Sequence, residues 1–516
     1  MPLILGCIIT AIYLTCKSCQ IINNRAQLRI KLILLFFVGL VLRMGYDQKF
    51  YRSCDNWTKG VQSEMKTLAG ECLIEKPQMC LLDTFDLLMD FSISDCSKSA
   101  YLPNAFSKYN TQKPFIALHD SRDIRNRSEL WSSIYDVAMN RVQGYDTLEE
   151  AQKYNEAVID VKNEKLHQKI IRNESLVEER QQNFKRAGAN KNMIVIYIDA
   201  LSRPRAHLKL PKTMQYFKEQ KEVYEFFKYS SLVAFTDDNA QAFSYGIDFD
   251  HSDQNKTYQS ISAFFKEQGY IIGKSQNQCD RFYYQMNETQ ELVQPYDPAD
   301  HEMLSFACDP HYHQIDFPDF AYIGPYSMFR KCLYGQDTFQ YVLNFGNDFM
   351  QTYDKERKVL FLNFIDYHEG SGTTIKFLDE PLAQFLKQHG KQDTTIIFMS
   401  DHGFHMNGPP LMLGKLFGQS QKERLLPLMI ISNLGDLKGG GEIYNIQLNQ
   451  QKLVYHKHLY NFWKYWATKQ HYGQSFFSQF DNDYFVCNEI GPNCKCENFL
   501  IKEKEDENSN QTQNSK

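Results

Sequence analysis

The chain has 516 residues, which is long enough for one large α/β domain and an accessory region. Its mild net charge of -5 argues against a nucleic-acid-binding protein, and so does the lack of a basic patch interleaved with aromatic residues. The mean hydropathy of -0.49 argues against a polytopic membrane protein.

Two short apolar runs stand near the N-terminus. Residues 2–16 and 32–42 are apolar, and residues 17–31 between them are polar and basic. Each run is shorter than the roughly 20 residues of a typical spanning helix, and the second matches a signal-peptide core or a short signal-anchor. No small-residue cleavage site follows the second run, so residues 1–46 are predicted to form an uncleaved membrane anchor with one or two hydrophobic segments. With two segments, the basic loop would be cytoplasmic and the rest of the chain lumenal.

The cysteines and the glycosylation sequons favour a lumenal or extracellular location for the rest of the chain. Ten of the 13 cysteines follow residue 50, and an even number is typical of disulfides in an oxidising compartment. Cys308 and Cys332 could close a local loop, although the pairing cannot be deduced. Cys487, Cys494 and Cys496 lack a fourth zinc ligand, so disulfides are predicted there too. The sequons are Asn56, Asn126, Asn173, Asn255, Asn287 and Asn510.

Residues 47–190 are predicted to form a cysteine-containing lumenal accessory region. They contain four cysteines and many aromatic residues, without a strong alternation of strands and helices. Within this region, residues 130–183 are polar and charged and have a helical tendency. We therefore expect a helical surface layer that leads into the core.

Residues 191–480 are predicted to form the catalytic α/β domain, because strands and helices alternate there. Continuous apolar runs predict strands buried on both faces at 193–198, 358–365 and 394–399. Further strands are predicted at 223–231, 270–272 and 428–432, and helices at 211–217, 260–268, 377–389 and 452–469. Residues 277–335 are predicted to be a long, ordered insertion that covers the substrate side. Residues 481–516 are predicted to form a Cys-rich end and a disordered tail.

Each of the three apolar strands is followed by residues suited to a metal. Asp199 follows the first strand, Asp366 and His368 follow the second, and Asp401 and His402 follow the third. Ligands of open α/β sheets bind beyond the carboxyl ends of the strands. One aspartate at such a place is more commonly a helix N-cap, but acids and histidines after three strands favour a metal centre.

Thr236 is a candidate nucleophile. Asp237 and Asp238 follow it, which is typical of the first turn of a helix, where backbone N–H groups face an anion. A threonine hydroxyl is a weak nucleophile, and it deprotonates more easily when it is bound to a divalent cation. Considered alone, Thr236 would be interpreted as an ordinary helix cap.

Several motifs in order resemble the alkaline phosphatase/sulfatase superfamily, and more closely its eukaryotic branch of unknown function, the DUF229 family. That family has Asp-Ser-X-Ser-Arg after the first strand, where this chain has Asp-Ala-Leu-Ser-Arg at 199–203. It has Ser-Asp-His-Gly, matched at 400–403, and then Glu-Arg before a strand, matched at 423–424. The insertion is also similar, at 306–310. The resemblance covers roughly residues 190–470.

The resemblance also extends to the segment around Thr236. The family has Asn-Thr-Phe-Pro-Asn, with ten residues from the Thr to a Gly. Thr236, Asn239 and Gly246 keep this register, whereas Asp237 and Asp238 replace Phe-Pro. The spacing assigns the nucleophile to Thr236, and Ser202 is then interpreted as a cap or a supporting residue.

The resemblance implies an alkaline-phosphatase-like three-layer sandwich with a mostly parallel central sheet and two divalent metal ions. Zinc is expected first, with calcium, magnesium or manganese as alternatives. One ion would be bound by Asp199, Thr236, Asp401 and His402. The second would be bound by Asp366 and His368, although their Asp-X-His spacing is tighter than the Asp-X-X-X-His of the superfamily. We assign His405 as the last ligand of the second ion, and His456 and His458 are the alternatives.

The resemblance further implies a metal-dependent hydrolase or transferase of phosphate esters, including glycan- or lipid-linked esters. Thr236 would attack phosphorus, and Asn239 or Arg203 would contact the anionic oxygens; a structural ion pair is an equal alternative for Arg203. A non-catalytic lumenal or extracellular glycoprotein is the second hypothesis, which the altered Thr-Asp-Asp-Asn motif favours. A sulfatase is the third, because the Cys-X-Pro-Ser-Arg motif is absent and Thr cannot become formylglycine.

Overall fold

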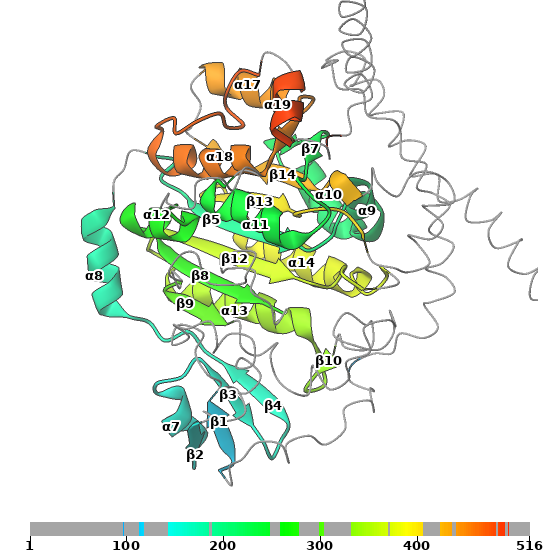
Figure 1. The fold of residues 1–516 in the computed structure, drawn as a ribbon. Helices are drawn as coiled ribbons and strands as arrows, with labels where there is room; N and C mark the ends of the chain where they lie inside the picture. The colour runs from blue at the N-terminus through cyan, green and yellow to red at the C-terminus, as the bar shows by residue number, and fades with distance from the viewer. Residues whose placement is uncertain are drawn as a thin grey trace, which may run out of the picture. The chain divides into compact units, whose positions relative to one another are not determined.

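The structure is a computed structural model (Figure 1). It describes residues 96, 113–117, 143–184, 188–247, 258–277, 299–303, 332–369, 372–405, 424–435, 440–480, 483–490 and 494. These all belong to one of the two compact units into which the chain divides. The predicted anchor at 1–46, the tail after 494 and most of the 277–335 insertion lie outside the described residues. Among the residues described, no helix is long and apolar enough to cross a membrane.

A seven-stranded sheet forms the centre of this unit. Its strand order is β6-β14-β13-β5-β12-β8-β9, and β14 alone runs against the other strands of the sheet. The predicted α/β fold with a mostly parallel central sheet is therefore confirmed. The strands are β5 (Asn192–Ile198), β6 (Val223–Glu225), β8 (Ile271–Gln276), β9 (His301–Met303), β12 (Lys358–Phe364), β13 (Thr394–Met399) and β14 (Met429–Ser432).

Helices cover both faces of the sheet, and each face has its own hydrophobic core. On β5, Met193, Val195 and Tyr197 belong to one core, and Ile194, Ile196 and Ile198 belong to the other. This double burial explains why the strand is apolar throughout. The first core includes residues of α11 (Thr236–Tyr245), α12 (Ile261–Glu267), α17 (Gly440–Asn449), α18 (His456–Thr468) and α19 (Asp483–Ile490). The second includes residues of α9 (Arg203–Lys209), α10 (Pro211–Glu219), α13 (Thr338–Thr352) and α14 (Lys376–His389).

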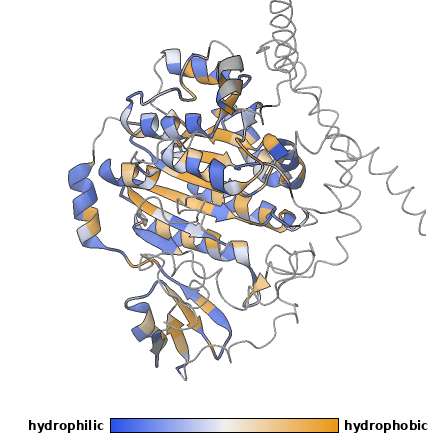
Figure 2. Cartoon of the chain, viewed as in Figure 1, coloured by the Kyte–Doolittle hydropathy of each residue, from blue (hydrophilic) through white to orange (hydrophobic). Residues whose placement is uncertain are grey.

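The hydropathy of the elements agrees with this layering. Figure 2 shows hydrophobic residues concentrated in the strands of the central sheet. In contrast, α8 (Glu174–Asn183) is largely hydrophilic, and only Val177 and Arg180 of its ten residues are buried. The polar sequence of this helix therefore reflects a surface position.

The helical layer predicted for residues 130–183 is wrong for most of the part that the structure describes. An antiparallel sheet of order β2-β1-β3-β4 lies there, accompanied by the short helix α7 (Leu148–Gln152). Its strands are β1 (Phe115–Ala117), β2 (Gln143–Tyr145), β3 (Ala157–Asp160) and β4 (Lys165–Gln168). Strands of three or four residues are too short for their alternation to stand out from a polar sequence. In β3, Ile159 packs against the second core and Val158 against Ala151 and Tyr145 on the other face.

Two predicted strands also differ from the observed ones. The strand at 223–231 is broken into β6 and β7 (Tyr229–Ser230), because the N–H of Phe227 bonds to Gln450 and the chain leaves the sheet. The short strand β15 (Val454–Tyr455) pairs with β7 and precedes α18. β8 extends to Gln276, since its polar residues are buried between β12 and β9. The strands β10 (Cys332–Leu333) and β11 (Gln336–Asp337) form a separate two-stranded antiparallel sheet.

Two disulfides lie among the described residues. Cys332 is bonded to Cys96, which is 236 positions away, so the predicted local pairing with Cys308 is wrong. Sequence distance was a poor guide because the fold brings Cys96 to the start of β10. Cys487 is bonded to Cys494, which confirms that cysteines of the C-terminal cluster form a disulfide.

Candidate metal centre

The candidate site lies where three neighbouring strands end. β12 and β13 both run parallel to β5, on either side of it, so their carboxyl ends share one edge of the sheet. Asp199 directly follows β5, and Asp401 and His402 follow β13. Ligand atoms of these three residues lie within 4.8 Å of one another, and all three side chains are buried. The fold therefore brings together three of the four side chains expected to hold the first metal.

The ring of His402 is oriented as in a metal ligand. Its Nδ1 lies 2.8 Å from the carbonyl oxygen of Gly403, which places the proton on Nδ1 and the lone pair on Nε2. Nε2 lies 3.2 Å from Asp401 Oδ2 and 3.8 Å from Asp199 Oδ1. Two buried carboxylates and an imidazole lone pair repel one another unless a cation lies between them. Carboxylate oxygen and imidazole nitrogen are ligands that zinc accepts, so these residues fit a divalent metal.

The turns after β5 and β13 hold these ligands together. Ala200 has a φ of 62°, which is uncommon for a residue other than glycine and marks a constrained turn. Its N–H donates to Asp401 Oδ1 at 3.3 Å. The hydroxyl of Ser400 accepts the N–H of Leu201 at 2.9 Å and donates to the carbonyl of His402 at 2.8 Å. Hydrogen bonds to the side chains of Ser400 and Asp401 thus connect the end of β13 to the end of β5.

Thr236 lies at the same place, as the first residue of α11. Its Oγ1 is 3.3 Å from Nε2 of His402, and it lies close to Asp401. The hydroxyl therefore adjoins two of the three residues with which it was predicted to share a metal.

Asn239 fixes the loop before Thr236. Its amide donates to the carbonyls of Val233 at 2.8 Å and Phe235 at 2.7 Å, and it accepts the N–H of Leu232 at 2.8 Å. The side chain is fully buried. Both of its N–H donors are thus used within this loop, which supports a role in positioning Thr236 and not the predicted contact with anionic oxygens.

Arg203 lies in a different environment from the one that its predicted role requires. Its Nε pairs with Glu225 Oε1 at 2.6 Å, and its guanidinium lies 4.0 Å from the ring centre of Phe227. Glu225 is also 2.6 Å from Nε2 of His207. This geometry supports the alternative of a structural ion pair.

The residues expected at a second metal are adjacent but less closely grouped. His405 lies 4.8 Å from His368 and 4.6 Å from His402, measured between ring centres. Asp366 does not join these two histidines in a group of three ligand atoms within 4.8 Å. Burial first, and then His402, lower the pKa of His368 to about 4; burial, His402, His368 and Arg424 lower that of His405 to about 2. Both rings are therefore neutral at pH 7, as metal ligands must be.

The two alternative histidines, His456 and His458, stand in the first turn of α18, and His456 also lies near Asp401 and His402. His456 is buried against the rings of Tyr229 and Phe243, with centroids 4.9 and 5.8 Å away. Burial lowers its pKa to about 4. His458 accepts the N–H of Tyr455 at 3.2 Å and caps α18. Of the three candidates, His405 is the one whose ring contacts both His368 and His402.

The structure adds residues that no sequence motif marked. Asn277 donates to Asp366 Oδ2 at 2.8 Å and accepts the N–H of Ile365 at 2.9 Å, and it is fully buried. Tyr197 lies beside Asp401 and Thr236, and burial and the charges of Asp199 and Asp401 raise its pKa well above the usual value. Tyr197 was hidden inside an apolar run, and Asn277 stands in no recognisable pattern.

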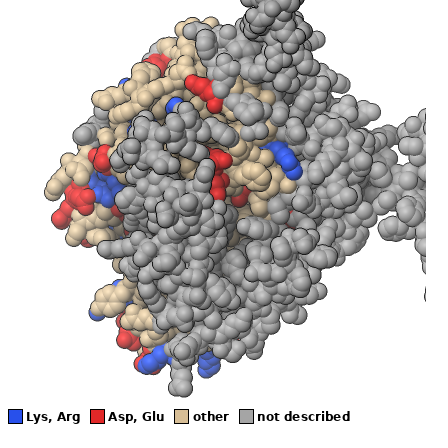
Figure 3. Space-filling view, viewed as in Figure 1, with Lys and Arg blue, Asp and Glu red and all other residues tan. Residues whose placement is uncertain are grey.

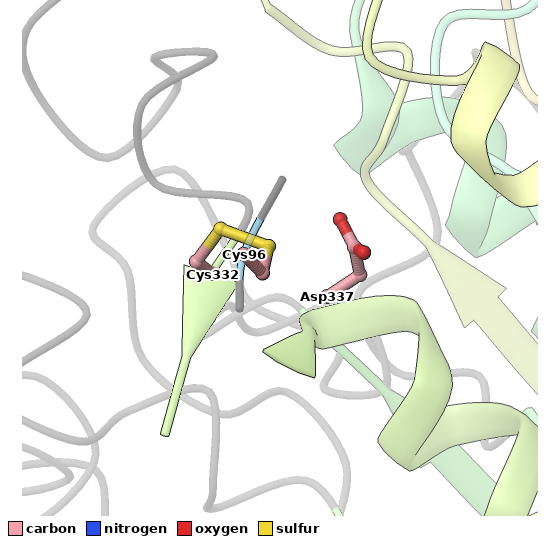
Figure 4. Close-up of side chains that lie close together, drawn as sticks. All are labelled: Cys96, Cys332 and Asp337. Atoms are coloured by element: carbon pink, nitrogen blue, oxygen red, sulfur yellow. A yellow bond between two sulfur atoms is a disulfide. The ribbon is translucent and has the colours of Figure 1, made fainter. Parts of the chain in front are cut away.

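One further group of potential ligands consists of Cys96, Cys332 and Asp337. Figure 4 shows that the two sulfur atoms are bonded to each other, with Asp337 beside them. A disulfide offers no thiolate, so this group is structural. Figure 3 shows acidic and basic side chains scattered over the described surface on this face, without a continuous basic area.

The chain belongs to the family described as "Protein of unknown function (DUF229)", whose model matches residues 138–461. A comparison with curated proteins finds no match. Among solved structures, the chain is similar to the periplasmic domain of EcEptC from Escherichia coli in complex with Zn, with 11% identity over 57% of this chain and 88% of that one and a TM-score of 0.38. It is also similar to the lipoteichoic acid synthase LtaP from Listeria monocytogenes, with 13% identity, coverage of 59% and 80%, and a TM-score of 0.37. A third is the soluble domain of lipooligosaccharide phosphoethanolamine transferase A from Neisseria meningitidis, with 11% identity, coverage of 54% and 88%, and a TM-score of 0.36.

Proposed function

We propose that this chain is a metal-dependent phosphoesterase or phosphotransferase with Thr236 as its nucleophile. The observation that carries the proposal is the meeting of the Thr236 hydroxyl, the Nε2 lone pair of His402 and two buried carboxylates at the end of β5. The motifs that resemble the alkaline phosphatase/sulfatase superfamily support the same reaction. The active site would face the lumen or the outside of the cell, with the N-terminus anchored in a membrane.

Asp199, Asp401, His402 and Thr236 would hold one divalent ion, for which zinc fits best. Asp366, His368 and His405 would hold a second, and Asn277 would orient Asp366 through its 2.8 Å hydrogen bond. A divalent ion bound there makes the threonine hydroxyl easier to deprotonate and offsets the negative charge of a phosphoryl group.

The chain's own residues would carry the transfer as follows. Thr236 Oγ1 loses its proton and forms a bond to phosphorus, while the bond from phosphorus to the leaving oxygen breaks and that oxygen takes up a proton from water to leave as an alcohol. Backbone N–H groups in the first turn of α11 face the anionic oxygens. Asn239 holds the loop in which Thr236 stands, and Tyr197 of β5 lies beside the hydroxyl.

The fate of the phosphorylated Thr236 would decide between two activities. If water breaks the Oγ–P bond, the chain is a phosphoesterase; if an alcohol does so, it is a transferase. Phe235 is 66% exposed, directly before Thr236, and its ring centre lies 5.7 Å from that of His405. A bare phenyl ring at this place would contact an apolar part of the substrate, which makes lipid-linked phosphate esters the first class to examine.

The test uses the full-length protein in detergent, with its bound metal measured and with phosphomonoesters, phosphodiesters and sulfate esters as substrates. We expect a bound divalent metal and turnover of a phosphate ester. Thr236→Ala should lower this turnover by about 10³-fold or more, whereas Thr236→Ser should keep a substantial share. Absence of both metal and turnover would support the glycoprotein hypothesis, and preference for sulfate esters would support a sulfatase.

A further inference from the structure

The segment from Arg424 to Leu428 is hydrogen-bonded to three of the loops that build the metal centre. Its carbonyl and N–H groups bond to the loop after β5, the loop before Thr236 and the loop after β13. The hydrogen bonds are Gly403 N–H to Arg424 C=O at 2.7 Å, Ser231 N–H to Leu425 C=O at 3.0 Å, Ser400 N–H to Leu428 C=O at 2.9 Å, and Leu428 N–H to Leu201 C=O at 3.1 Å. Arg424 is consequently fixed beside the Ser-Asp-His-Gly turn.

The side chain of Arg424 lies next to His405. Its Nη2 donates to the carbonyl oxygen of His405 at a long 3.4 Å. Its Nε is buried and has no hydrogen-bond partner among the described residues. A guanidinium has five N–H donors, and a buried N–H without an acceptor is unfavourable. An anion at the metal centre would give the guanidinium group a charged acceptor.

Arg203 provides the contrast. Its charge is offset by Glu225 at 2.6 Å and its plane is covered by the ring of Phe227. Arg424 forms no ion pair of 4.0 Å or less with any carboxylate in the part of the chain that the structure describes. Between these two arginines, Arg424 is therefore the one whose charge no carboxylate of the described residues offsets.

We infer that Arg424, and not Arg203, binds the anionic oxygens of the substrate's phosphoryl group. The planar guanidinium presents paired donors that match phosphate oxygens, and these bonds are stronger than neutral ones. The inference rests on the proposed function because it names a substrate contact at the same site. It replaces the assignment of Arg203 by a residue of the Glu-Arg pair at 423–424.

The experiment compares Arg424→Ala with Arg203→Ala in the full-length, metal-loaded protein. Inorganic phosphate is the probe, its affinity is measured by calorimetry, and the bound metal is measured in parallel. For Arg424→Ala we expect phosphate affinity to fall roughly 10- to 100-fold with the metal content unchanged, and added guanidinium ion to restore part of the affinity. Arg203→Ala should leave phosphate affinity unchanged and lower the unfolding temperature.

Two outcomes would overturn the inference. In the first, Arg424→Ala binds phosphate as the wild type does; in the second, Arg203→Ala loses phosphate affinity instead. If the wild type binds phosphate through Arg424 but turns over no phosphate ester, the proposed function is contradicted and this inference is not. If Arg424→Ala keeps both its turnover and its phosphate affinity, this inference is contradicted and the proposed function is not.

Discussion

Two buried histidines, His402 and His301, lie at different places on the same central sheet and have opposite surroundings. The Nε2 of His402 faces the carboxylates of Asp401 at 3.2 Å and Asp199 at 3.8 Å. His301, on the edge strand β9, has its Nδ1 2.7 Å from Glu156 Oε1 and its Nε2 2.7 Å from the hydroxyl of Tyr353. One histidine faces a surplus of acceptors, whereas the other has a partner for each nitrogen.

Both ring nitrogens of His301 have a hydrogen-bond partner. The hydroxyl of Tyr353 accepts the N–H of Asn173 at 3.0 Å, so it can donate to His301 Nε2, and His301 Nδ1 can then donate to Glu156. Next to it, Arg180 pairs with Asp300 at 2.8 Å. These contacts join the segment before β5 to the edge of the sheet.

The difference shows that burial of polar groups alone does not mark a functional site. Buried groups that hydrogen-bond to one another stabilise a junction, as around His301. Buried acceptors that face one another, as around His402, favour the binding of a cation. The four predictions below use this contrast.

The largest effect is expected from His402→Gln, compared with His301→Gln. The first change removes a ligand from the metal centre, so the bound metal should be lost and turnover should fall by about 10³-fold or more. The second change should leave the metal content as in the wild type. Metal analysis of both purified variants, with a phosphate-ester assay, checks this. Equal metal loss in both variants would remove the distinction between the two regions.

Removal of the metal should lower the stability of the wild type strongly. A ligand at 1,000 times its dissociation constant stabilises the folded state by about 4 kcal/mol, so chelation should lower the unfolding temperature. His301→Gln should show the same decrease on chelation, because its metal centre is intact. His402→Gln should show almost none. Thermal unfolding with and without a chelator measures this, and a wild type insensitive to chelation would contradict the metal assignment.

A smaller effect is expected from His301→Gln on stability alone. The glutamine cannot bond to Glu156 and Tyr353 in the same geometry, which leaves buried groups unsatisfied. The free energy of unfolding should fall by about 1–3 kcal/mol. Denaturant unfolding of the metal-loaded variant measures it, with His167→Gln, on the half-buried edge strand β4, as a control that should change little. A fully stable His301→Gln would show that the network contributes nothing.

The smallest effect concerns a second charged cluster, in which Glu225 forms ion pairs with Arg203 and His207. Burial raises the pKa of Glu225, but Arg203 and His207 outweigh it and lower this pKa to about 2 from 4.5. Because the folded state favours the ionised carboxylate, the ion pairs raise the free energy of unfolding above pH 4.5. This contribution is lost as the pH falls toward 2. Glu225→Gln should lack this part of the acid dependence, measured as the difference between the two unfolding curves from pH 6 to pH 3. Parallel curves would show that the ion pair adds no stability.

The sequence predicts which side chains meet at the candidate metal centre better than the roles of their neighbours. Asp199, Asp401 and His402 could be predicted because each stands within three residues of the end of a long apolar strand, and parallel strands end at one edge. Arg203 and Asn239 stand in equally recognisable motifs, but their partners decide what they do. Glu225 neutralises Arg203 across α9 and β6, and the bonds of Asn239 to its own loop become visible only in the structure.

The length of each strand, and the distance in sequence between paired residues, explain most of the remaining differences between prediction and structure. The strands at 193–198, 358–365 and 394–399 are long and doubly buried, so their apolar pattern is unambiguous. β1 to β4 have three or four residues each, and a helical tendency in the surrounding polar sequence concealed them. The pairing of Cys96 with Cys332 depends on a contact over 236 positions, which no local pattern encodes.

The central place of β5 has a consequence for how the chain is made. Both neighbours of this strand are encoded later, and the nearer one, β12, begins roughly 160 residues after β5 ends, from Ile198 to Lys358. At a synthesis rate of roughly 5–20 residues per second, the nascent β5 is without either neighbour for about 8–30 s. An apolar strand with two open edges can associate with other chains. Nascent chains that stop before β13 are therefore expected to depend on chaperones and to aggregate when released early.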